Sequence, residues 1–295
     1  MMEDYMIRVL TKNKQIRALA VRSTNLVEEA RQIHKTTPVA TAALGRALSA
    51  VSMMIALEKS GEKIGLRILG DGPLDRVIAE ANMNGEVKGF VGNPQIDIML
   101  NEKKNEKKLD VKKAIGNGEL YVRKMMGLKE PYESKIQLIS GEIGEDLTYY
   151  YTKSEQVPSS VGLGVLIDTD SSVKAAGGFI IQLLPDTPEE TIAKLESNLN
   201  SLGSVSRLIE TGITPEELLD KVLEGFSYDI TKVTEVEYNC SCSKGQTLEI
   251  VNTLNVDEIK ESLKEDGYVE VTCHYCNESY RYNEEYLKEH LEREW

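Results

Sequence analysis

The sequence lacks the motifs by which many enzymes bind nucleotides or activate nucleophiles. It has no P-loop pattern, and the glycine pairs Gly116/Gly118 and Gly162/Gly164 lack the third glycine of a dinucleotide fingerprint. The hydrolase patterns G-x-S-x-G and H-E-x-x-H are also missing. The chain has only 3 histidines, and none is placed as in a Ser–His–Asp triad. These absences argue against nucleotide-driven work and against an enzyme.

Positive charge is also scarce. The chain carries 35 Lys and Arg against 48 Asp and Glu, a formal net charge of −13. Phosphate backbones are bound through Lys and Arg, and anionic membranes repel acidic proteins, so we expect neither nucleic acid nor a membrane as a partner. Residues 228–295 hold 16 acidic and 7 basic residues, whereas the other 227 residues hold 32 and 28. This contrast predicts a separate C-terminal unit.

The sequence contains little that resembles a targeting or membrane-spanning segment. Residues 1–17 lack the apolar stretch of a signal peptide. The most apolar window, residues 39–57, is rich in Ala, Ser and Thr and contains Arg46. A helix of small residues is typical of close packing inside a core rather than of a membrane span. We therefore expect a soluble, cytosolic protein.

Apolar residues make up 41% of the sequence, which is enough for a packed core and favours a folded chain. The length of 295 residues suggests about two domains. Short strand-like segments, with Asn84-Gly85 as a hairpin signal, follow two helices near the N-terminus. This arrangement predicts an α+β fold, with a mixed sheet-and-helix domain over residues 1–185. Its predicted strands are residues 5–11, 65–70, 77–81, 87–91, 120–124, 135–138, 162–168 and 178–184, and its helices begin near Asn25 and Pro38.

The pattern changes after Pro185. Thr187-Pro-Glu-Glu and Thr214-Pro-Glu-Glu both read as helix starts, with Thr as the N-cap, Pro at N1 and Glu at N3. Apolar stripes at helical spacing follow: Ile192, Leu195, Leu199 and Leu202 after the first, and Leu218, Leu219, Val222, Leu223 and Phe226 after the second. Since amphipathic helices need a surface to cover, we predict that residues 186–232 form a helical connector lying on the N-terminal domain.

All 4 cysteines lie in the last 56 residues, as a C-x-C pair and a C-x-x-C pair separated by 30 residues: Cys240, Cys242, Cys273 and Cys276. The reducing cytosol opposes structural disulfides, and four thiolates supply a tetrahedral shell for Zn²⁺. An iron–sulfur cluster is the main alternative, and unmetallated thiols are the other. A thioredoxin-like pair would need a βαβ context, which is missing. With four sulfurs available, His34, His274 and His290 are interpreted as exposed structural residues rather than ligands.

The segment around these cysteines predicts a small metal-binding module over residues 233–295. Its expected elements are strands at 248–251 and 268–272, a helix at 257–266 that stops at Gly267, and a last helix capped by Asn283. The apolar content is low for so acidic a unit. We therefore expect metal binding to supply much of its folding free energy, and metal removal to unfold it.

Several segments resemble the heat shock protein 33 family over essentially the whole chain. They are residues 34–48 (HKTTPVATAALGRAL), 70–74 (GDGPL), 140–150 (SGEIGEDLTYY), 154–159 (SEQVPS) and 175–185 (AAGGFIIQLLP), together with the closing C-x-C…C-x-x-C. The resemblance implies a redox-regulated holdase chaperone of the bacterial cytosol that binds unfolding client proteins without ATP or another nucleotide. It also implies one zinc ion per reduced chain, held by the four cysteines.

The resemblance further implies that an oxidant converts the cysteines to the disulfides Cys240–Cys242 and Cys273–Cys276, although four cysteines allow three connectivities. Zinc loss would then unfold the module and the connector, expose their apolar surfaces to clients and favour a homodimer. We expect both parts to open before clients bind.

Two other functions remain compatible with the cysteine spacing. The first is a zinc-ribbon adaptor that binds nucleic acid or a transcription complex, which the acidic charge around the cysteines opposes. The second is a thiol-disulfide oxidoreductase that uses Cys273 and Cys276, for which insulin reduction would be the diagnostic activity.

Overall fold

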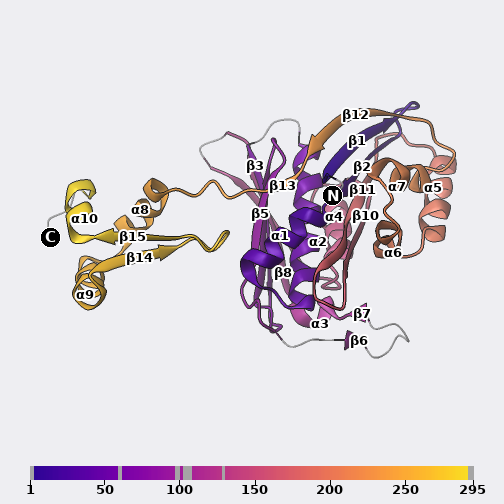
Figure 1. Ribbon diagram of the computed structural model, residues 1–295. Coiled ribbons are helices and arrows are strands. Elements are labelled where there is room, and N and C mark those ends of the chain that lie inside the picture. Colours follow the sequence, from indigo (N-terminus) through magenta and orange to yellow (C-terminus); the bar gives the residue numbers. More distant parts are fainter. Residues whose placement is uncertain (1–2, 59–61, 97–99, 102–107, 128–129, 292–295) are drawn as a thin grey trace. The chain divides into compact units, whose positions relative to one another are not determined.

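The computed structural model describes residues 3–58, 62–96, 100–101, 108–127 and 130–291 of the chain (Figure 1). Two compact units are present, residues 1–239 (unit 1) and residues 240–295 (unit 2). The boundary of 233 drawn from the sequence falls inside strand β12 (Tyr228–Glu235), which pairs with β1 (Tyr5–Thr11) in unit 1. Backbone pairing therefore keeps residues 233–239 with the N-terminal domain, although their charge resembles that of the tail.

Unit 1 is an α+β fold with two main sheets, as the sequence predicts. The five-stranded sheet is antiparallel and has the order β10-β11-β2-β1-β12. The six-stranded sheet has the order β13-β5-β4-β3-β8-β9, and only its β13–β5 pair is parallel. The remaining strands are β2 (Ile16–Arg22), β3 (Lys63–Gly70), β4 (Arg76–Asn82), β5 (Glu86–Val91), β8 (Gly118–Met125), β9 (Tyr132–Gln137), β10 (Ser159–Ile167), β11 (Val173–Leu183) and β13 (Glu237–Tyr238), and a separate pair is β6 (Leu100–Asn101) with β7 (Lys108–Leu109).

Helix α2 (Pro38–Leu57) lies in the core between the two sheets (Figure 1). Every residue from Val39 to Leu57 is buried, and the helix contacts β4, β5, β10 and β11. Its small side chains permit this close packing: a Cβ at Gly45 would lie 2.6 Å from Cγ1 of Val27. The helix is long and apolar enough to cross a membrane, but its apolar window is entirely buried in unit 1. It is a core helix, as predicted, and this supports a soluble protein.

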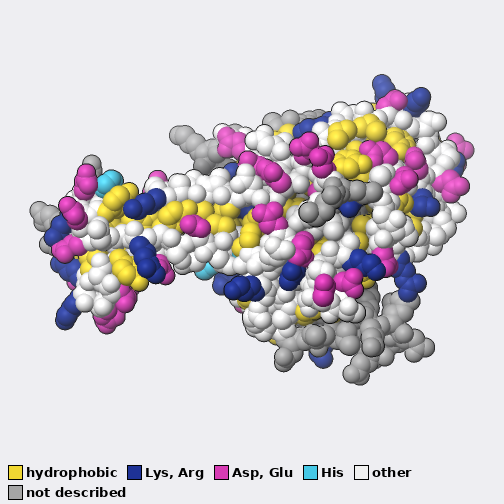
Figure 2. All heavy atoms as spheres, viewed as in Figure 1, with side chains coloured by type: hydrophobic (Ala, Val, Ile, Leu, Met, Phe, Trp, Pro, Cys, Tyr) yellow, Lys and Arg dark blue, Asp and Glu magenta, His cyan; other side chains and the backbone are white. Residues whose placement is uncertain are grey.

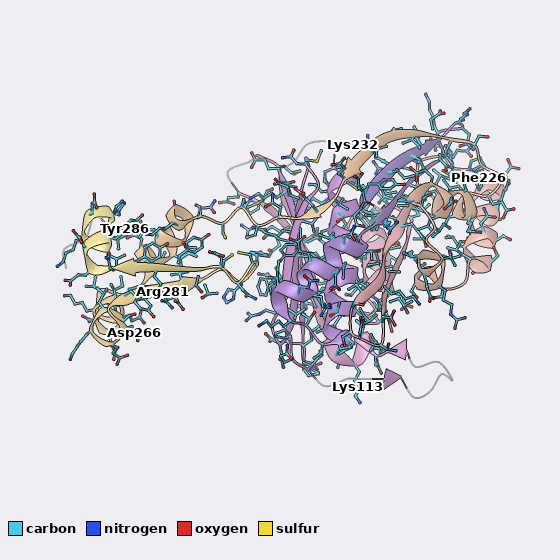
Figure 3. All side chains as sticks on the ribbon, viewed as in Figure 1. Lys113, Phe226, Lys232, Asp266, Arg281 and Tyr286 are labelled. Carbon is cyan, nitrogen blue, oxygen red and sulfur yellow. The ribbon has the colours of Figure 1, made fainter. Side chains whose placement is uncertain are left out.

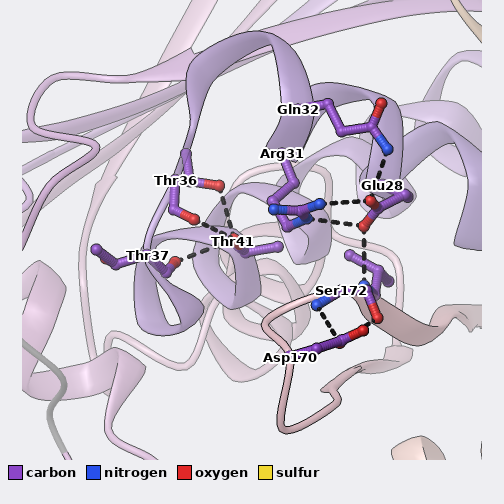
Figure 4. Close-up of polar contacts among 9 residues, drawn as sticks. Glu28, Arg31, Gln32, Thr36, Thr37, Thr41, Asp170 and Ser172 are labelled. Atoms are coloured by element: carbon purple, nitrogen blue, oxygen red, sulfur yellow. Dashed lines mark hydrogen bonds and ion pairs between the residues drawn. The ribbon is translucent and has the colours of Figure 1, made fainter.

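Helix α1 (Thr24–His34) is held to β11 by a hydrogen-bonded carboxylate (Figure 4). Glu28 accepts bonds from Nε and Nη2 of Arg31 at 2.8 and 2.6 Å, from Gln32 at 2.8 Å and from the backbone N–H of Val173 at 2.9 Å. The hydrogen bonds from Arg31, and then those from Val173 and Gln32, outweigh the effect of burial and lower the pKa of Glu28 to about 2.

We predict that Glu28→Gln destabilises unit 1 at pH 7 by about 1–2 kcal/mol, because the charge-assisted bonds become neutral ones. The folded pKa lies below the ordinary value of 4.5, so the stabilisation is complete above about pH 4.5 and is lost as pH falls towards 2. Urea unfolding from pH 7 to pH 2.5 should show the two proteins converging. Glu29→Gln is the control, because burial raises the pKa of Glu29 and its removal should cost no such stability. A constant difference at all pH values would contradict the prediction.

The connector consists of α5 (Glu189–Ser201), α6 (Val205–Glu210) and α7 (Pro215–Val222), and it packs on the five-stranded sheet. Its predicted apolar stripes meet strand residues in one hydrophobic cluster, which includes Leu195, Leu218, Leu219 and Val222 together with Ile7, Val9, Ala18 and Phe179. Several acidic side chains of these helices are exposed, among them Glu189, Glu196, Glu217 and Asp220. Figure 2 shows acidic side chains interspersed with basic and hydrophobic ones on this part of the surface. The helices predicted within residues 186–232 do cover the five-stranded sheet, but residues 228–232 belong to strand β12 rather than to a helix.

Other elements of unit 1 differ from the prediction. Strand β2, helix α3 (Val111–Ile115), strands β12 and β13, and helix α4 (Gly144–Lys153) were not expected. Helix α4 contains three tyrosines and two threonines, which are weak helix formers. It is stabilised at its N-terminus by the fully buried Asp146, which accepts the backbone N–H groups of Ile139, Ser140 and Ile143 at 2.8–3.0 Å. These hydrogen bonds form only when the loop before the helix is folded. The helix propensities of the residues in α4 therefore give little indication of the helix.

Unit 2 is built on the hairpin of β14 (Tyr268–Thr272) and β15 (Ser279–Asn283), with α8 (Lys244–Thr253), α9 (Val256–Asp266) and α10 (Glu284–His290). The predicted stop at Gly267 and the Asn283 cap are confirmed. The predicted strand at 248–251 is wrong, because this segment is part of α8. Ser243 caps α8 by accepting the N–H of Gln246, and Val251 is buried, so capping and packing override the strand-like run.

Candidate metal centre

The four cysteines approach one another from two short segments of unit 2. Cys240 and Cys242 lie in the extended segment before α8, whose N-cap is Ser243. Cys273 and Cys276 lie in the turn of the β14–β15 hairpin. The N–H of Cys273 donates to the carbonyl of Glu278 at 2.9 Å, and Asn277, with φ of 58°, donates its N–H to the carbonyl of Cys273 at 2.8 Å. This tight turn brings both C-x-x-C sulfurs to one side of the hairpin.

All four Sγ atoms lie within 4.8 Å of one another, as expected for the ligands of one ion. The Sγ atoms of Cys240 and Cys273 are 3.7 Å apart, and those of Cys242 and Cys276 are 3.3 Å apart. All four cysteines are free thiols. Tetrahedral Zn²⁺ with Zn–S bonds of about 2.3 Å requires sulfurs about 3.8 Å apart, so the donor set and its spacing fit zinc.

The thiols do not share one electrostatic environment. Burial, with hydrogen bonds among the thiols, raises the pKa of Cys240 and of Cys276. Burial also acts to raise the pKa of Cys242, but hydrogen bonding with Tyr280 and with the other thiols outweighs it and lowers that pKa. The protein alone therefore favours ionisation of Cys242, and a divalent cation is the group that would hold all four as thiolates.

The histidines take no part in this cluster. His274 and His290 are exposed, and His290 stacks on Tyr286 of α10 with ring centroids 3.9 Å apart (Tyr286 is labelled in Figure 3). His34 differs from the prediction of an exposed residue, because it is buried in unit 1 with Nε2 3.2 Å from the hydroxyl of Tyr238. Within the part of the chain that the structure describes, the four cysteines are the group able to hold a metal ion.

Two tyrosines near the cysteines were not identified from the sequence. The Tyr238 hydroxyl, two positions before Cys240, donates to the carbonyl of Gly89 at 2.9 Å and anchors β13 to β5. The Tyr280 hydroxyl lies 3.3 Å from Sγ of Cys242 and 3.3 Å from its carbonyl oxygen. In the segment Ser279–Asn283, tyrosines alternate with polar residues, and this pattern could have indicated a strand. Whether Tyr280 or Tyr282 faces the sulfurs depends on the register of the hairpin.

The apolar core of unit 2 is small. Its buried members are Val251, Ile259, Val269, Tyr282, Leu287 and Leu291. Tyr282 is fully buried, and its hydroxyl donates to the carbonyl of Lys244 at 2.7 Å, which ties β15 to the start of α8. So few apolar side chains leave much of the folding free energy to another source, and a bound ion at the four sulfurs fits that need.

Comparison with known proteins gives a consistent result. A family model described as "Hsp33 protein" matches residues 4–283. The "33 kDa chaperonin" of Bacillus subtilis is 44% identical over 286 residues, which cover 97% of each chain. That of Brevibacillus brevis is 46% identical over 292 residues, covering 98% of this chain and 99% of the relative. The crystal structure of the 33 kDa chaperonin (heat shock protein 33 homolog) from Thermotoga maritima superimposes with a TM-score of 0.90 at 36% identity, covering 98% of this chain and 97% of that one.

Proposed function

Because this chain belongs to the Hsp33 family of chaperones, and is therefore not an enzyme, we propose that it is a redox-regulated, ATP-independent holdase of the bacterial cytoplasm. In the reduced protein, Cys240, Cys242, Cys273 and Cys276 hold one zinc ion, and the protein is inactive. After oxidation and loss of the metal, it binds unfolding client proteins. The observation that carries the proposal is the convergence of four free thiols to within 4.8 Å.

The cysteines supply both the metal site and the sensor. Bound zinc would keep the sulfurs as thiolates, which are the oxidisable form. Each pair of thiolates is oxidised by one peroxide, and uptake of two protons from solvent gives one disulfide and two waters. The pairs we propose, from the family resemblance, are Cys240–Cys242 and Cys273–Cys276. Once both have formed, no thiolate remains to bind the metal.

The surface that becomes available to clients is the one that the connector now covers. The sheet residues Ile7, Val9, Ala18 and Phe179 and the apolar faces of α5 and α7 are buried against each other. Opening of the connector would expose both sides at once, and exposed apolar surface of this kind binds unfolded chains. The same surface can mediate the homodimer that we expect of the oxidised form.

The chain provides a direct link between the cysteines and the connector. The segment after α7 forms β12 and β13 and continues without a break into Cys240. Strand β12 pairs with β1 along its whole length, and β13 is anchored by Tyr238. Disorder that begins at Cys240 therefore reaches β13 and β12 before it reaches α7. Segments with few buried contacts open first, and the exposed Ile230 and Val233 of β12 place it in that class.

The test is to treat the reduced, zinc-loaded protein with peroxide while zinc release and client aggregation are followed together. We expect one equivalent of zinc to be released, and light scattering from a thermally unfolding client to be suppressed only afterwards. Retained zinc, or equal suppression in the reduced and oxidised states, would contradict the switch. A titration with nucleic acid is expected to show no salt-dependent binding, since the tail carries 16 acidic and 7 basic residues, and binding would favour the adaptor function instead.

A further inference from the structure

The hydroxyl of Tyr280 is placed to act on one sulfur of the four. It lies 3.3 Å from Sγ of Cys242, and both residues belong to unit 2. Tyr280 sits in β15 directly opposite Val271 of β14 and packs against the core of unit 2. The strand pairing and this packing fix the ring, so the contact with Cys242 follows from the hairpin itself.

The direction of this hydrogen bond follows from the state of the sulfur. As a thiol, Cys242 can donate S–H to the Tyr280 oxygen while the hydroxyl donates to the carbonyl of Cys242, 3.3 Å away. As a metal-bound thiolate, the sulfur has no proton and only accepts. The Tyr280 hydroxyl must then donate to Sγ, which gives one ligand a charge-assisted hydrogen bond.

We propose that Tyr280 is a positioning residue that helps to retain Cys242 on the metal and slows the oxidation of that sulfur. The inference rests on the proposed function and goes beyond it by assigning a role to a residue that is not itself a ligand. Partners that hydrogen-bond to metal ligands orient them and raise metal affinity, typically by 10- to 100-fold. A hydrogen bond to a thiolate also withdraws negative charge from sulfur, and among fully ionised sulfurs the less basic one is the weaker nucleophile.

The chemical step that Tyr280 slows is the attack of the Cys242 thiolate on peroxide. The sulfur displaces hydroxide from the O–O bond and becomes a sulfenic acid, so that sulfur is oxidised and the peroxide is reduced. A second thiolate then displaces hydroxide from that sulfenic acid to form the disulfide. With the Tyr280 hydroxyl in place, the attack of Cys242 on peroxide is slower than it would be without that hydrogen bond.

Tyr280→Phe tests the proposal, because it removes the hydroxyl and keeps the ring. Tyr268→Phe is the matched control in the same hairpin, where the ring lies under the Arg281 guanidinium with its carbon 4.5 Å from the ring centroid (Arg281 is labelled in Figure 3). Zinc affinity is measured by competition with a chelator. Oxidation of each cysteine is followed by thiol trapping and mass spectrometry during limiting peroxide. We expect Tyr280→Phe to weaken zinc binding about 10-fold and to oxidise Cys242 several-fold faster, and Tyr268→Phe to match the parent.

Cobalt provides a readout that a purely structural role would not move. In the Co²⁺-loaded proteins, loss of the hydrogen bond should shift the thiolate-to-cobalt charge-transfer band to lower energy in Tyr280→Phe but not in Tyr268→Phe. An unshifted band with parental zinc affinity and an unchanged Cys242 rate would overturn the role of Tyr280 and leave the switch intact. If the parent protein keeps its zinc under peroxide, the proposed redox switch is wrong, but the cobalt band and the zinc affinity still test the role of Tyr280. If the parent protein binds neither zinc nor cobalt, both the proposed function and the role of Tyr280 are wrong.

Discussion

Gly164→Ala is expected to make the reduced, zinc-loaded protein an active chaperone without oxidant. Gly164 lies in β10 beneath α6, and a Cβ at this position would be 2.6 Å from the backbone nitrogen of Ser206 and 2.7 Å from its Cα. Both atoms belong to the backbone of α6, so no side-chain rotation can relieve the clash. Helix α6 must move off the sheet, and overpacking of this kind costs about 1–3 kcal/mol.

Displacement of α6 should loosen the whole connector. Ile209 of α6 is buried, and Val205 and Leu208 pack with the cluster that includes the apolar faces of α5 and α7. A few kcal/mol is a large fraction of the free energy that holds a local segment closed. The client-binding surface would then be exposed while the four cysteines still hold the metal. Activity of this variant would show that opening of the connector is enough for client binding, against the expectation from the sequence that the C-terminal module must open as well.

The measurement is client light scattering with the reduced variant, with zinc content determined in the same sample. Gly65→Ala is the matched control: it also lies in a strand of unit 1, but its nearest neighbour to an added Cβ is 3.8 Å away. We expect Gly65→Ala to remain inactive until oxidised. Hydrogen exchange should show faster exchange in α6 of Gly164→Ala alone. An inactive Gly164→Ala with rapidly exchanging α6 would place the client surface outside the connector.

The two Thr-Pro-Glu-Glu segments show where prediction from sequence stops. At Thr214 the expected capping box forms: Thr214 accepts the N–H of Glu217 at 3.2 Å, and the Glu217 carboxylate accepts the N–H of Thr214 at 2.8 Å. At Thr187 it does not, because this hydroxyl donates to the carbonyls of Gln15 and Leu184, and α5 begins at Glu189. The local sequence is the same, and a carbonyl 172 residues away decides the outcome.

For the candidate metal centre, the sequence was enough to predict the four cysteines but not the residues that surround them. Four cysteines in two close pairs need no tertiary information to indicate a tetrahedral thiolate site, and the structure brings their sulfurs together. The contact of Tyr280 with Cys242 depends on the register of β14 and β15, and the anchoring of Tyr238 depends on the pairing of β13 with β5. The candidate ligands can therefore be read from short sequence segments. Strand pairing places the neighbouring tyrosines, which contact Cys242 or anchor the segment before Cys240.

Removal of the metal from the reduced protein is expected to unfold unit 2 and leave unit 1 folded. Among the described residues of unit 2, six apolar side chains are buried in its core, and the segment is strongly acidic. A metal bound at the four sulfurs would therefore supply most of the stabilisation, which amounts to ~10–16 kcal/mol in small zinc peptides. Limited proteolysis after chelation should cut within residues 240–291 and spare the strands of unit 1. The variant Cys276→Ser should behave in the same way without a chelator, and added zinc should restore protection only to the parent protein.

The chelated protein also tests whether loss of unit 2 is sufficient for client binding. The connector helices bury their apolar faces against the sheet of unit 1 rather than within the core of unit 2, so they have their own source of stability. We therefore expect chelation at 25 °C to unfold unit 2 alone and to leave client aggregation unchanged, because disorder that begins at Cys240 opens the connector only at the temperature of the thermal assay. Chelation of Gly164→Ala at 25 °C should give no more protection than Gly164→Ala alone. Strong suppression by the chelated parent protein, with α6 still protected from hydrogen exchange, would contradict this and place the client-binding surface in the unfolded residues 240–291.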